Sequence, residues 1–596
     1  MRQHLLLFVL LFSANAFAQI PENELPHFAT TLEQASMPDA RPVLPASAFS
    51  DPPAMPVRAM AEWEELQALV ITWRAHPAIL TEIVRAAREE CRVIILCNNA
   101  STITSAQNTL VAAGVDITSN VEFLLAPNDS IWVRDYGPNC VYANDVDSLY
   151  FVDWRYNRTS RRRDDTVSTT LGPYLGVPLY TTSVAPNDLV HTGGNFMSDG
   201  MGTAFSSDLI LEENQSGNPY GASVKNREQI EGILRNYMGV ERYILMEKLP
   251  FDVIHHIDMH MKLLDEQTLL VGEYPPGTAD GPQIEANIQY VLANHPSSFG
   301  SPYRVIRVPM PPDALGEFPN VGGDYRTYAN AMFVNKTVLV PFYEEKHDTT
   351  ARRIWQEALP GYRIVGIDCN AIIPSLGAIH CITKEVGAAD PLRIVHRPLT
   401  NVLQTPLNPT GYPVFATLQH RSGIQSARVW YTLDTTAAWQ FVDMLPTTTD
   451  SLNLWAAEIP RQNVVSTQPV FYYIEANAFS GKSQVRPLPA PRGWWRFNIE
   501  VSPVSNAPEP SGAGLLTVFP NPASAMTCVP VTCTGSTRGH IGLFDALGRE
   551  IIALYDGDIP TGTSRYFFDA GALPAGVYWV RLQAGGAVMS QMVVVR

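Results

Sequence analysis

The sequence predicts an α/β region followed by two all-β regions. Between Trp63 and about Val386, apolar runs of strand length alternate with helical patterns, which is typical of α/β folds. Beyond Pro391 the runs become short and are separated by turns. The 47 prolines and 39 glycines also favour a turn-rich, strand-rich architecture. At about 150 residues per domain, 596 residues predict roughly three to five structural units.

The α/β region is assigned to residues 56–390. Apolar runs predict strands at Leu69–Trp73, Arg92–Cys97, Arg304–Val308 and Thr337–Phe342. Helical periodicity predicts helices near Pro77–Glu90, Asn226–Tyr237 and Ile284–Ala293. This alternation of strands and helices over about 330 residues predicts an α/β fold.

Two all-β regions follow. Residues 391–502 fit an immunoglobulin-like β-sandwich, which needs about 100 residues of short strands. Its predicted strands are Ala427–Thr432, Leu454–Glu458 and Val470–Glu475. Residues 503–514 are rich in proline and glycine and predict a linker, and residues 515–596 predict a small all-β module. Strands in that module are expected at Phe519–Pro522, Ile541–Asp545 and Gly576–Leu582.

The N-terminal residues predict export. Residues 1–18 combine a short basic start, the apolar run Leu5–Phe12 and the small-residue pattern Ala16-Phe17-Ala18, which is typical of a secretory signal peptide. Residues 19–55 are rich in proline, alanine and serine and predict an extended leader. Because no other apolar run reaches about 18 residues, we do not expect a membrane-spanning helix.

Charge and cysteine content exclude two classes of protein. The 58 acidic residues outnumber the 42 basic ones and give a net charge of -16, so a nucleic-acid partner is not expected. Seven cysteines are too few for a disulfide scaffold. The odd number leaves at least one free thiol or a pairing with another molecule.

Four segments carry chemically useful side chains: Trp132–Pro138, His191–Phe196, His256–Met259 and Gly377–Glu385. In an extended chain His256 and Asp258 would share one face, which places a base beside a carboxylate. A structural His–Asp pair is the alternative. Cys381 is either a nucleophile or a buried filler. Its neighbour His380 would point to the opposite face of a strand, so His256 is the better candidate for the base.

These residue types together point to deimination. Carboxylates pair bidentately with a planar guanidinium, a thiolate can attack the guanidinium carbon, and a histidine can protonate the departing ammonia. A cysteine protease remains an alternative, although it needs no pair of carboxylates aimed at the substrate. A metal hydrolase is less favoured, because the sequence has no HExxH motif and no CxxC with zinc spacing.

In order along the chain, several motifs resemble the bacterial agmatine deiminase and peptidylarginine deiminase superfamily. The motifs are Ala61-Glu62-Trp63-Glu64, Trp132–Pro138, His256-x-Asp258, Tyr328–Ala331, Val340-Pro341 and Ile379–Thr383. The resemblance covers roughly residues 55 to 390. It implies a pentein fold, which is a five-bladed α/β propeller, and a reaction that uses no metal or organic cofactor.

The resemblance also implies roles for individual residues. Cys381 corresponds to the nucleophile and His256 to the general acid and base. Asp135 and Asp258 would grip the guanidinium, and Asn330 would order the site. Trp132 would form an apolar wall for the aliphatic stem of the substrate, whereas Asn195 and Asp199 belong to a loop that shapes the site.

The substrate implied by the resemblance is an arginine in a peptide or protein. A C-terminal arginine is expected, because in the secreted Porphyromonas-type enzymes two arginines bracket the substrate carboxylate. Arg158 follows Tyr156-Asn157 as it does in the secreted Porphyromonas-type enzymes, and Arg161 fits the second position with a one-residue insertion. A solvated basic turn is the alternative for this loop. Agmatine is the alternative substrate, and an inactive pentein that serves in binding or adhesion is the second alternative function.

The C-terminal module resembles the sorting domain of the type IX secretion system. The motifs that carry this resemblance are Val518–Pro522, Asp545–Arg549 and Leu573–Tyr578. It implies that the type IX machinery is a partner, and that the protein is secreted or attached to the outer-membrane surface. One more sandwich domain with a binding role is the alternative.

Overall fold

The computed structural model describes residues 25–36, 48–404, 411–447, 453–462, 464, 466–501, 512–545, 548–585 and 587–596. The signal peptide predicted at 1–18 lies outside the described residues, as do residues 19–24 and 37–47 of the predicted leader and most of the predicted linker. Within the leader, residues 31–36 form helix α1 (Thr31–Ser36) where the sequence predicted extended chain. No helix in the described part of the chain has the length and apolar character needed to cross a membrane.

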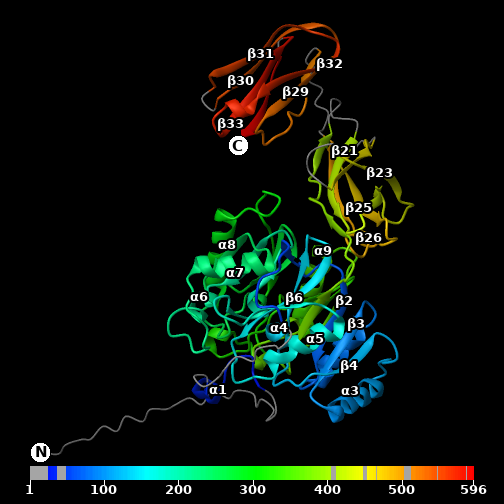
Figure 1. The fold of residues 1–596 in the computed structure, drawn as a ribbon. Helices are drawn as coiled ribbons and strands as arrows, with labels where there is room; N and C mark the ends of the chain where they lie inside the picture. The colour runs from blue at the N-terminus through cyan, green and yellow to red at the C-terminus, as the bar shows by residue number, and fades with distance from the viewer. Residues whose placement is uncertain are drawn as a thin grey trace, which may run out of the picture.

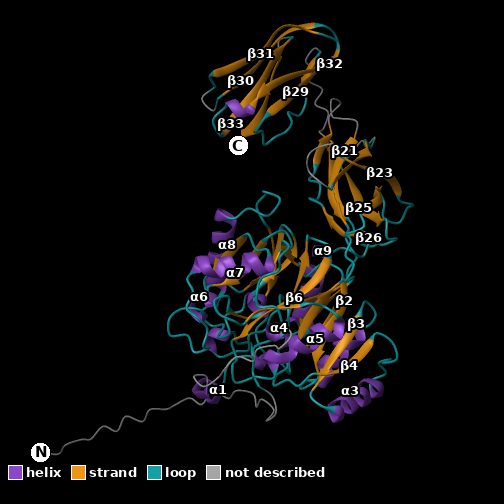
Figure 2. Cartoon of the chain, in the orientation of Figure 1, coloured by secondary structure: helices purple, strands orange, loops and turns teal. Residues whose placement is uncertain are grey.

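The α/β region contains five separate sheets (Figures 1 and 2). The first two are β18-β2-β3-β4 (Thr383–Gly387, Leu66–Thr72, Arg92–Cys97, Val121–Leu125) and β1-β5-β6-β7 (Val57–Ala59, Asn139–Ala143, Ser148–Tyr156, Leu179–Thr182), with β8 (Val190–His191) beside β6. The other three are β9 to β11 (Met197–Ser198, Thr203–Ser207, Arg242–Met246), β12 to β14 (Met261–Asp265, Thr268–Glu273, Arg304–Pro309) and β15 to β17 (Met332–Val334, Thr337–Phe342, Arg363–Asp368).

One pairing pattern recurs in all five sheets. In each sheet a middle strand pairs antiparallel with one neighbour and parallel with the other. The trios, with the middle strand second, are β18/β2/β3, β5/β6/β7, β9/β10/β11, β12/β13/β14 and β15/β16/β17. The parallel strand always follows a helix, as a parallel connection requires. These helices are α2 (Pro77–Ala87), α5 (Val167–Leu175), α6 and α7 (Leu209–Glu213, Arg227–Met238), α8 (Gly281–Asn294) and α9 (Glu345–Ala358). Helix α3 (Ala100–Ala112) joins β3 to β4.

The predicted elements of this region are confirmed, and local sequence explains their ends. Strands β3 and β16 have the predicted bounds. Helix α7 begins with a capping box between Asn226 and Gln229 and ends at Gly239, whose φ of 66° suits a glycine at a helix C-terminus. Helix α2 begins with Pro77. Proline lacks a backbone N–H, and this costs nothing in the first turn of a helix because an N–H there has no partner within the helix.

Two all-β regions follow (Figure 2). Their predicted strands lie within observed ones, except that Ile541–Asp545 extends one residue past the observed strand Thr537–Phe544 and Phe519–Pro522 forms no strand. The first has nine strands in the order β19-β21-β24-β23-β22-β25-β27-β20, with β26 beside β25. Their bounds are Arg393–Val395, Val402–Gln404, Gly411–Gln419, Ile424–Thr432, Gln440–Pro446, Leu454–Pro460, Gln468–Ala478, Ser483–Arg486 and Trp495–Val501 for β19 to β27.

The second all-β region has the sheets β28-β29-β32 and β31-β30-β33-β34. Their bounds are Ala513–Leu515, Met526–Cys533, Thr537–Phe544, Glu550–Ile559, Gly562–Asp569, Gly576–Ala584 and Ala587–Val595 for β28 to β34. The strand predicted at Phe519–Pro522 is wrong: prolines lack the N–H that a ladder needs, and only an isolated bridge joins Phe519 to Cys528. All seven cysteines are described, and all are free thiols.

The hydrophobic core of the α/β region extends into its centre. Its largest cluster of buried side chains runs from Met60 to Val386 and includes Trp132 and Cys381. The first all-β region and the C-terminal strands have separate cores. The chemically useful side chains are therefore held within the largest core of the chain.

Candidate active site

Five short segments converge at the centre of the α/β region. Four are helical turns that precede the first strand of an antiparallel pair: α4 (Val133–Tyr136), η3 (Gly193–Asn195), η4 (Ile257–Met259) and η7 (His380–Ile382). The fifth is the loop before β15 that carries Asn330. Turn α4 contacts both η3 and η7, and η3 contacts η4. Each of the five sheets therefore contributes one segment to a shared centre.

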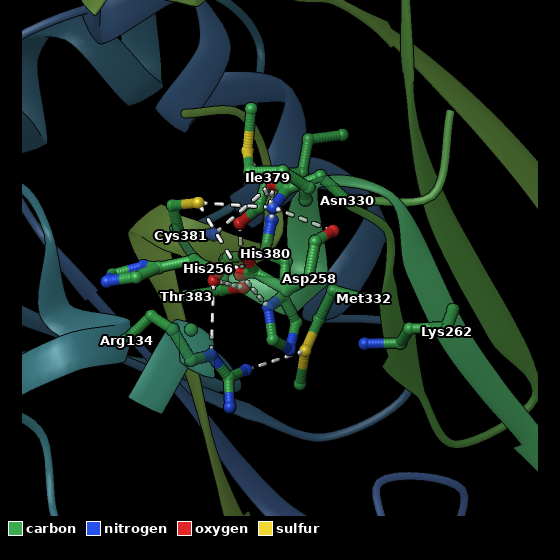
Figure 3. Close-up of polar contacts among 12 residues, drawn as sticks. Arg134, His256, Asp258, Lys262, Asn330, Met332, Ile379, His380, Cys381 and Thr383 are labelled. Atoms are coloured by element: carbon green, nitrogen blue, oxygen red, sulfur yellow. Dashed lines mark hydrogen bonds and ion pairs between the residues drawn. The ribbon is translucent and has the colours of Figure 1, made fainter. Parts of the chain in front are cut away.

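Asp258 is positioned by His380, a buried histidine of the α/β region. His380 Nδ1 lies 2.6 Å from Asp258 Oδ2 (Figure 3), and His380 Nε2 lies 3.0 Å from Glu62 Oε1. Both ring nitrogens face carboxylate oxygens, so both donate and the ring is an imidazolium. Burial opposes ionisation of Asp258, but the hydrogen bond and charge of His380 hold its pKa below the usual range. Asp258 Oδ1 is buried and has no hydrogen-bond partner among the described residues.

Cys381 is fully buried and is oriented by Asn330. The Asn330 amide donates to Cys381 Sγ at 3.1 Å, while its carbonyl accepts from the backbone N–H groups of His380 and Cys381 (Figure 3). The thiol lies 3.6 Å from Asp258 Oδ2. Burial, together with the negative charges of Asp258 and Asp135, raises the pKa of Cys381 well above its ordinary value. A cation between these groups would favour the thiolate.

His256 lies opposite Asp135. Its Nε2 is hydrogen-bonded to Thr192 Oγ1 at 3.0 Å, and its Nδ1 lies 3.7 Å from Asp135 Oδ1. Burial lowers the pKa of His256 to about 4, although the carboxylates of Asp135 and Asp258 oppose this shift. The imidazole is therefore neutral near pH 7 and able to accept a proton.

Gly194 has no side chain and so keeps open the space between His256, Asp258 and Asp135. A Cβ at Gly194 would lie 2.5 Å from His256 Nδ1, 3.1 Å from Asp258 Oδ2 and 3.2 Å from Asp135 Oδ1. The Gly194 N–H donates to Asp135 Oδ1 at 3.0 Å. Any side chain here would fill the point on which a base and two carboxylates converge.

The leader reaches the same point. His27 Nε2 lies 2.5 Å from Asp135 Oδ2, and its ring stacks on Trp132 with centroids 4.4 Å apart and an angle of 10° between the planes. Trp132 also donates its Nε1 hydrogen to Leu25 O. Burial opposes ionisation of Asp135, but the two imidazoles of His27 and His256 hold its pKa below the usual range.

Both predicted substrate-binding arginines also contact the leader. Arg158 donates from Nε and Nη2 to His27 O at 3.1 and 3.0 Å. Arg161 binds the Glu33 carboxylate through Nε and Nη2 at 2.7 and 3.1 Å. Both arginines are buried, whereas their neighbours Arg162 and Arg163 are exposed, so the alternative of a solvated basic turn describes only the latter two.

One trio of side chains has the composition of a metal site. His27, Asp135 and His256 each offer a ligand atom within 4.8 Å of the others. His27 has no lone pair to offer, however, because its Nδ1 lies 2.7 Å from Leu376 O and its Nε2 donates to Asp135. We therefore derive no chemistry from a metal at these residues.

A family model for Porphyromonas-type peptidyl-arginine deiminases matches residues 58–386, which are 329 of the 596 residues. The chain belongs to this family. The matched residues contain all five converging segments. A model for the secretion system C-terminal sorting domain matches residues 517–596 and implies export to the cell surface or beyond.

Similar proteins of known sequence or structure cover about half of this deiminase family member. Two curated relatives carry the name "Putative agmatine deiminase". The one from Vibrio parahaemolyticus is 25% identical over 45% of this chain and 79% of its own length. The one from Yersinia pseudotuberculosis is 26% identical over 47% of this chain and 80% of its own. A solved structure that carries the same name covers 57% of this chain and 100% of its own, with 21% identity and a TM-score of 0.50, and this shows a shared fold.

The structure brings together the residues that the family resemblance suggested, with two corrections of local geometry. His256 and Asp258 do not share the face of a strand, because Ile257–Met259 form a 3₁₀ turn. His380 is not turned away from the site by strand alternation, because it begins the turn η7 and binds Asp258. Asn195 and Asp199 shape loops as expected. Asn195 accepts a hydrogen bond from the backbone N–H of Ser207, and Asp199 accepts from those of Met201 and Thr203.

Four residues of the site were not predicted: His27, Glu62, Thr192 and Glu33. Glu62 and Thr192 lie inside quoted motifs, so they were present as signals without a role. His27 and Glu33 belong to the leader and reach Asp135 and Arg161 from more than 100 residues away in the sequence. No local pattern reports a contact of that range.

Proposed function

We propose that this chain is an exported protein-arginine deiminase that hydrolyses the guanidinium of peptidyl arginine, at a C-terminal position, to citrulline and ammonia. One observation carries the proposal. The Cys381 thiol lies 3.6 Å from one oxygen of Asp258, and the other oxygen is buried and unpartnered among the described residues. A planar cation that binds this carboxylate presents its carbon to the sulfur.

Substrate binding would supply the charge that ionises the nucleophile. A guanidinium between Asp135 and Asp258 offsets the two negative charges that raise the pKa of Cys381. The thiolate then attacks the guanidinium carbon and forms a C–S bond, while the π electrons of the cation move onto nitrogen. The adduct is tetrahedral and neutral.

His256 carries the protons in both halves of the reaction. The neutral imidazole first accepts the thiol proton of Cys381 and then passes it to one amino group, so that the C–N bond breaks and ammonia leaves with its electron pair. The remaining S-alkylthiouronium cation is attacked by water, whose proton passes to His256. Collapse of the second adduct breaks the C–S bond and releases the thiolate, the hydroxyl proton passes to solvent to leave the neutral ureido product, and His256 returns its proton to the thiolate.

The substrate class is supported by the two arginines. Arg161 already binds a carboxylate in bidentate fashion, and Arg158 holds a main-chain carbonyl with two N–H groups. Both are contacts that the C-terminal residue of a peptide could satisfy and agmatine could not. The sorting domain also supports a peptide substrate, because export would bring the enzyme to surroundings in which peptides and proteins are available.

Agmatine deimination to N-carbamoylputrescine is the second candidate. The names of the curated relatives favour it. A catalytically inactive pentein that binds a partner is a third candidate, and the complete set of Cys381, His256, Asp135 and Asp258 argues against it, since loss of any one would disable deimination.

The finer architecture is also part of the proposal. The recurring strand pattern supports five blades of a pentein propeller around the site, within residues 56–390. The nine strands of residues 391–502 support an immunoglobulin-like sandwich, and residues 515–596 support the sorting module after a linker at 503–514. The signal peptide at 1–18 and the leader at 19–55 complete the division.

A ureido assay tests the function. The purified chain is incubated with a C-terminal-arginine peptide, the same peptide with a blocked carboxyl, an internal-arginine peptide, free arginine and agmatine. We expect the C-terminal-arginine peptide to react fastest, and Cys381→Ala to lose at least about 10⁴-fold in turnover while it remains folded by circular dichroism. Product from agmatine alone would overturn the peptide assignment, and an active Cys381→Ala variant would exclude the nucleophile.

A further inference from the structure

Residues 25–30 of the leader lie in the proposed substrate site without regular secondary structure and bend at His27 and Phe28. The four carbonyls of Leu25, Pro26, His27 and Phe28 are all bound: by Trp132 Nε1, Arg161 Nη2, Arg158 and again Arg161 Nη2, at 2.7 to 3.1 Å. The His27 N–H donates to Ser375 O at 2.9 Å. A surface that satisfies each carbonyl of a short segment is built for a peptide backbone.

His27 occupies the Asp135 side of the space in which the reaction needs a guanidinium. Its Nδ1 faces Leu376 O and its Nε2 faces Asp135 Oδ2, and because both partners are acceptors the ring is a planar cation. It lies flat on Trp132 and meets His256 edge-on with centroids 4.9 Å apart. The leader therefore presents a planar cation to a carboxylate, an aromatic wall and the proposed base, as an arginine side chain would.

Helix α1 fixes the segment at a second point. Glu33, which lies in this helix, accepts two hydrogen bonds from Arg161 and a further one from Ser160 Oγ at 3.1 Å. Beside the segment lies a hollow of about 710 Å³ that is lined by Phe28 and Gln34 of the leader and by Arg158 and Tyr325 of the α/β region. The leader thus fills the deep part of the site and leaves an open space next to it.

We propose that residues 25–36 are an autoinhibitory leader that binds the active site as an internal ligand, with His27 in place of the substrate guanidinium. The proposal rests on the proposed function for its effect on turnover, but not for the binding itself. Asp135, Trp132, Arg158 and Arg161 cannot hold the leader and a peptide substrate together. The full chain is therefore latent until the leader is displaced or cut away, and the same surface binds a free peptide of this sequence.

Substitution in the leader tests the effect on turnover. The variant His27→Ala/Glu33→Ala removes the cation and the helix anchor without touching the α/β region. We expect kcat/KM for a C-terminal-arginine peptide to rise by about tenfold or more, since each lost contact is a charge-assisted hydrogen bond. Leu32→Ala is the matched control, because Leu32 is in the same helix and is 83% exposed. It should behave as the unmodified chain.

A binding readout separates this inference from the proposed function. Iodoacetamide labelling of Cys381, followed by mass spectrometry, reports whether the site is open even if no substrate is turned over. We expect faster labelling in the double variant, and a blocked synthetic peptide of residues 25–36 should slow it again. The same peptide with His27→Ala should bind more weakly.

The outcomes are distinct. Equal kcat/KM in the double variant and the unmodified chain would overturn the autoinhibition, and so would an unchanged labelling rate. Absence of product from both, with faster labelling that the peptide reverses, would overturn the deiminase assignment and support the leader as a ligand. Circular dichroism checks folding, and His27→Gln alone repeats the test if the double variant does not fold.

Discussion

Two carboxylates of the site are alike in burial and differ in what holds them. Asp258 is paired with His380, which is part of the α/β core and is itself tied to Glu62. Asp135 is paired with His27, which belongs to a leader more than 100 residues away. In both pairs an imidazolium donates to a buried carboxylate, at 2.6 and 2.5 Å.

The difference shows how one carboxylate of the site can stay fixed in place while the other can exchange its partner for substrate. The fixed partner keeps Asp258 ionised and positions it next to Cys381 whether or not substrate is bound. The replaceable partner acts with His256 and the Gly194 N–H to keep Asp135 ionised while the leader is present, and its departure leaves a site for another planar cation. An unpaired buried carboxylate is unfavourable, so the leader stabilises Asp135 until substrate takes its place.

Asp258→Asn and Asp135→Asn test the comparison with the largest effects. Both should lower turnover by about 10³-fold or more, because both carboxylates would grip the guanidinium. Their effects on stability should differ. Loss of a buried partner from a fixed pair typically reduces the free energy of unfolding by about 3 kcal/mol, and this applies to Asp258→Asn.

Asp135→Asn should change the free energy of unfolding by less than about 1 kcal/mol, because an Asn can still accept from Gly194 N–H and His27 can move to solvent. Urea unfolding followed by circular dichroism measures both variants. Equal destabilisation would show that the two pairs are equally structural.

His380→Ala tests the fixed side alone. His380 acts through Asp258, so its loss should lower kcat by about tenfold to a hundredfold with little change in KM. His380→Asn, which retains a donor toward Asp258, should recover part of the loss. A change confined to thermal stability, with kcat intact, would reduce His380 to a structural role.

Arg158→Ala tests the replaceable side. Because Arg158 holds a carbonyl of the leader now and would hold a carboxylate of the substrate, its loss should lower kcat/KM for C-terminal-arginine peptides by about tenfold more than for carboxyl-blocked peptides. The measurement is the ratio of the two values in the variant and in the unmodified chain. Equal losses on both peptides would remove the carboxylate contact.

The smallest expected effect is on pH. Burial opposes ionisation of Glu33, but Arg161 lowers its pKa from 4.5 to about 2 in the bound leader. The contribution of this ion pair is thus complete above the free pKa and falls as pH drops toward the bound one. Affinity of the 25–36 peptide for the His27→Ala/Glu33→Ala chain should fall about twofold from pH 6 to pH 4.5.

Fluorescence anisotropy of a labelled peptide measures this affinity. A Glu33→Gln peptide is the control, since it lacks the titrating group and should lose the twofold step. The same pH dependence in both peptides would assign the effect to another group.

The sequence predicted the elements of the fold better than their assembly. Strands such as Arg92–Cys97 and Thr337–Phe342 follow from unbroken apolar runs, which need no distant information. The fivefold recurrence of the strand pattern was not detectable, because the five sheets share pairing geometry and not residues.

The site was predicted through ordered motifs, and local geometry was where the prediction failed. His256 and His380 were assigned by strand alternation, yet both lie at 3₁₀ turns in which that alternation does not hold. His27 and Glu33 could not be found, because a contact between a leader and a distant aspartate or arginine leaves no local pattern. These contacts depend on the distances between side chains in the folded chain, which spacing in the sequence does not report.

The most direct test of this account compares ureido formation from a C-terminal-arginine peptide by the unmodified chain, by His27→Ala/Glu33→Ala and by that variant with Cys381→Ala. The account predicts at least about tenfold higher kcat/KM in the leader variant, and no product once Cys381 is replaced. Equal rates in the first two chains would contradict the role of the leader, and product from the third would contradict the chemistry.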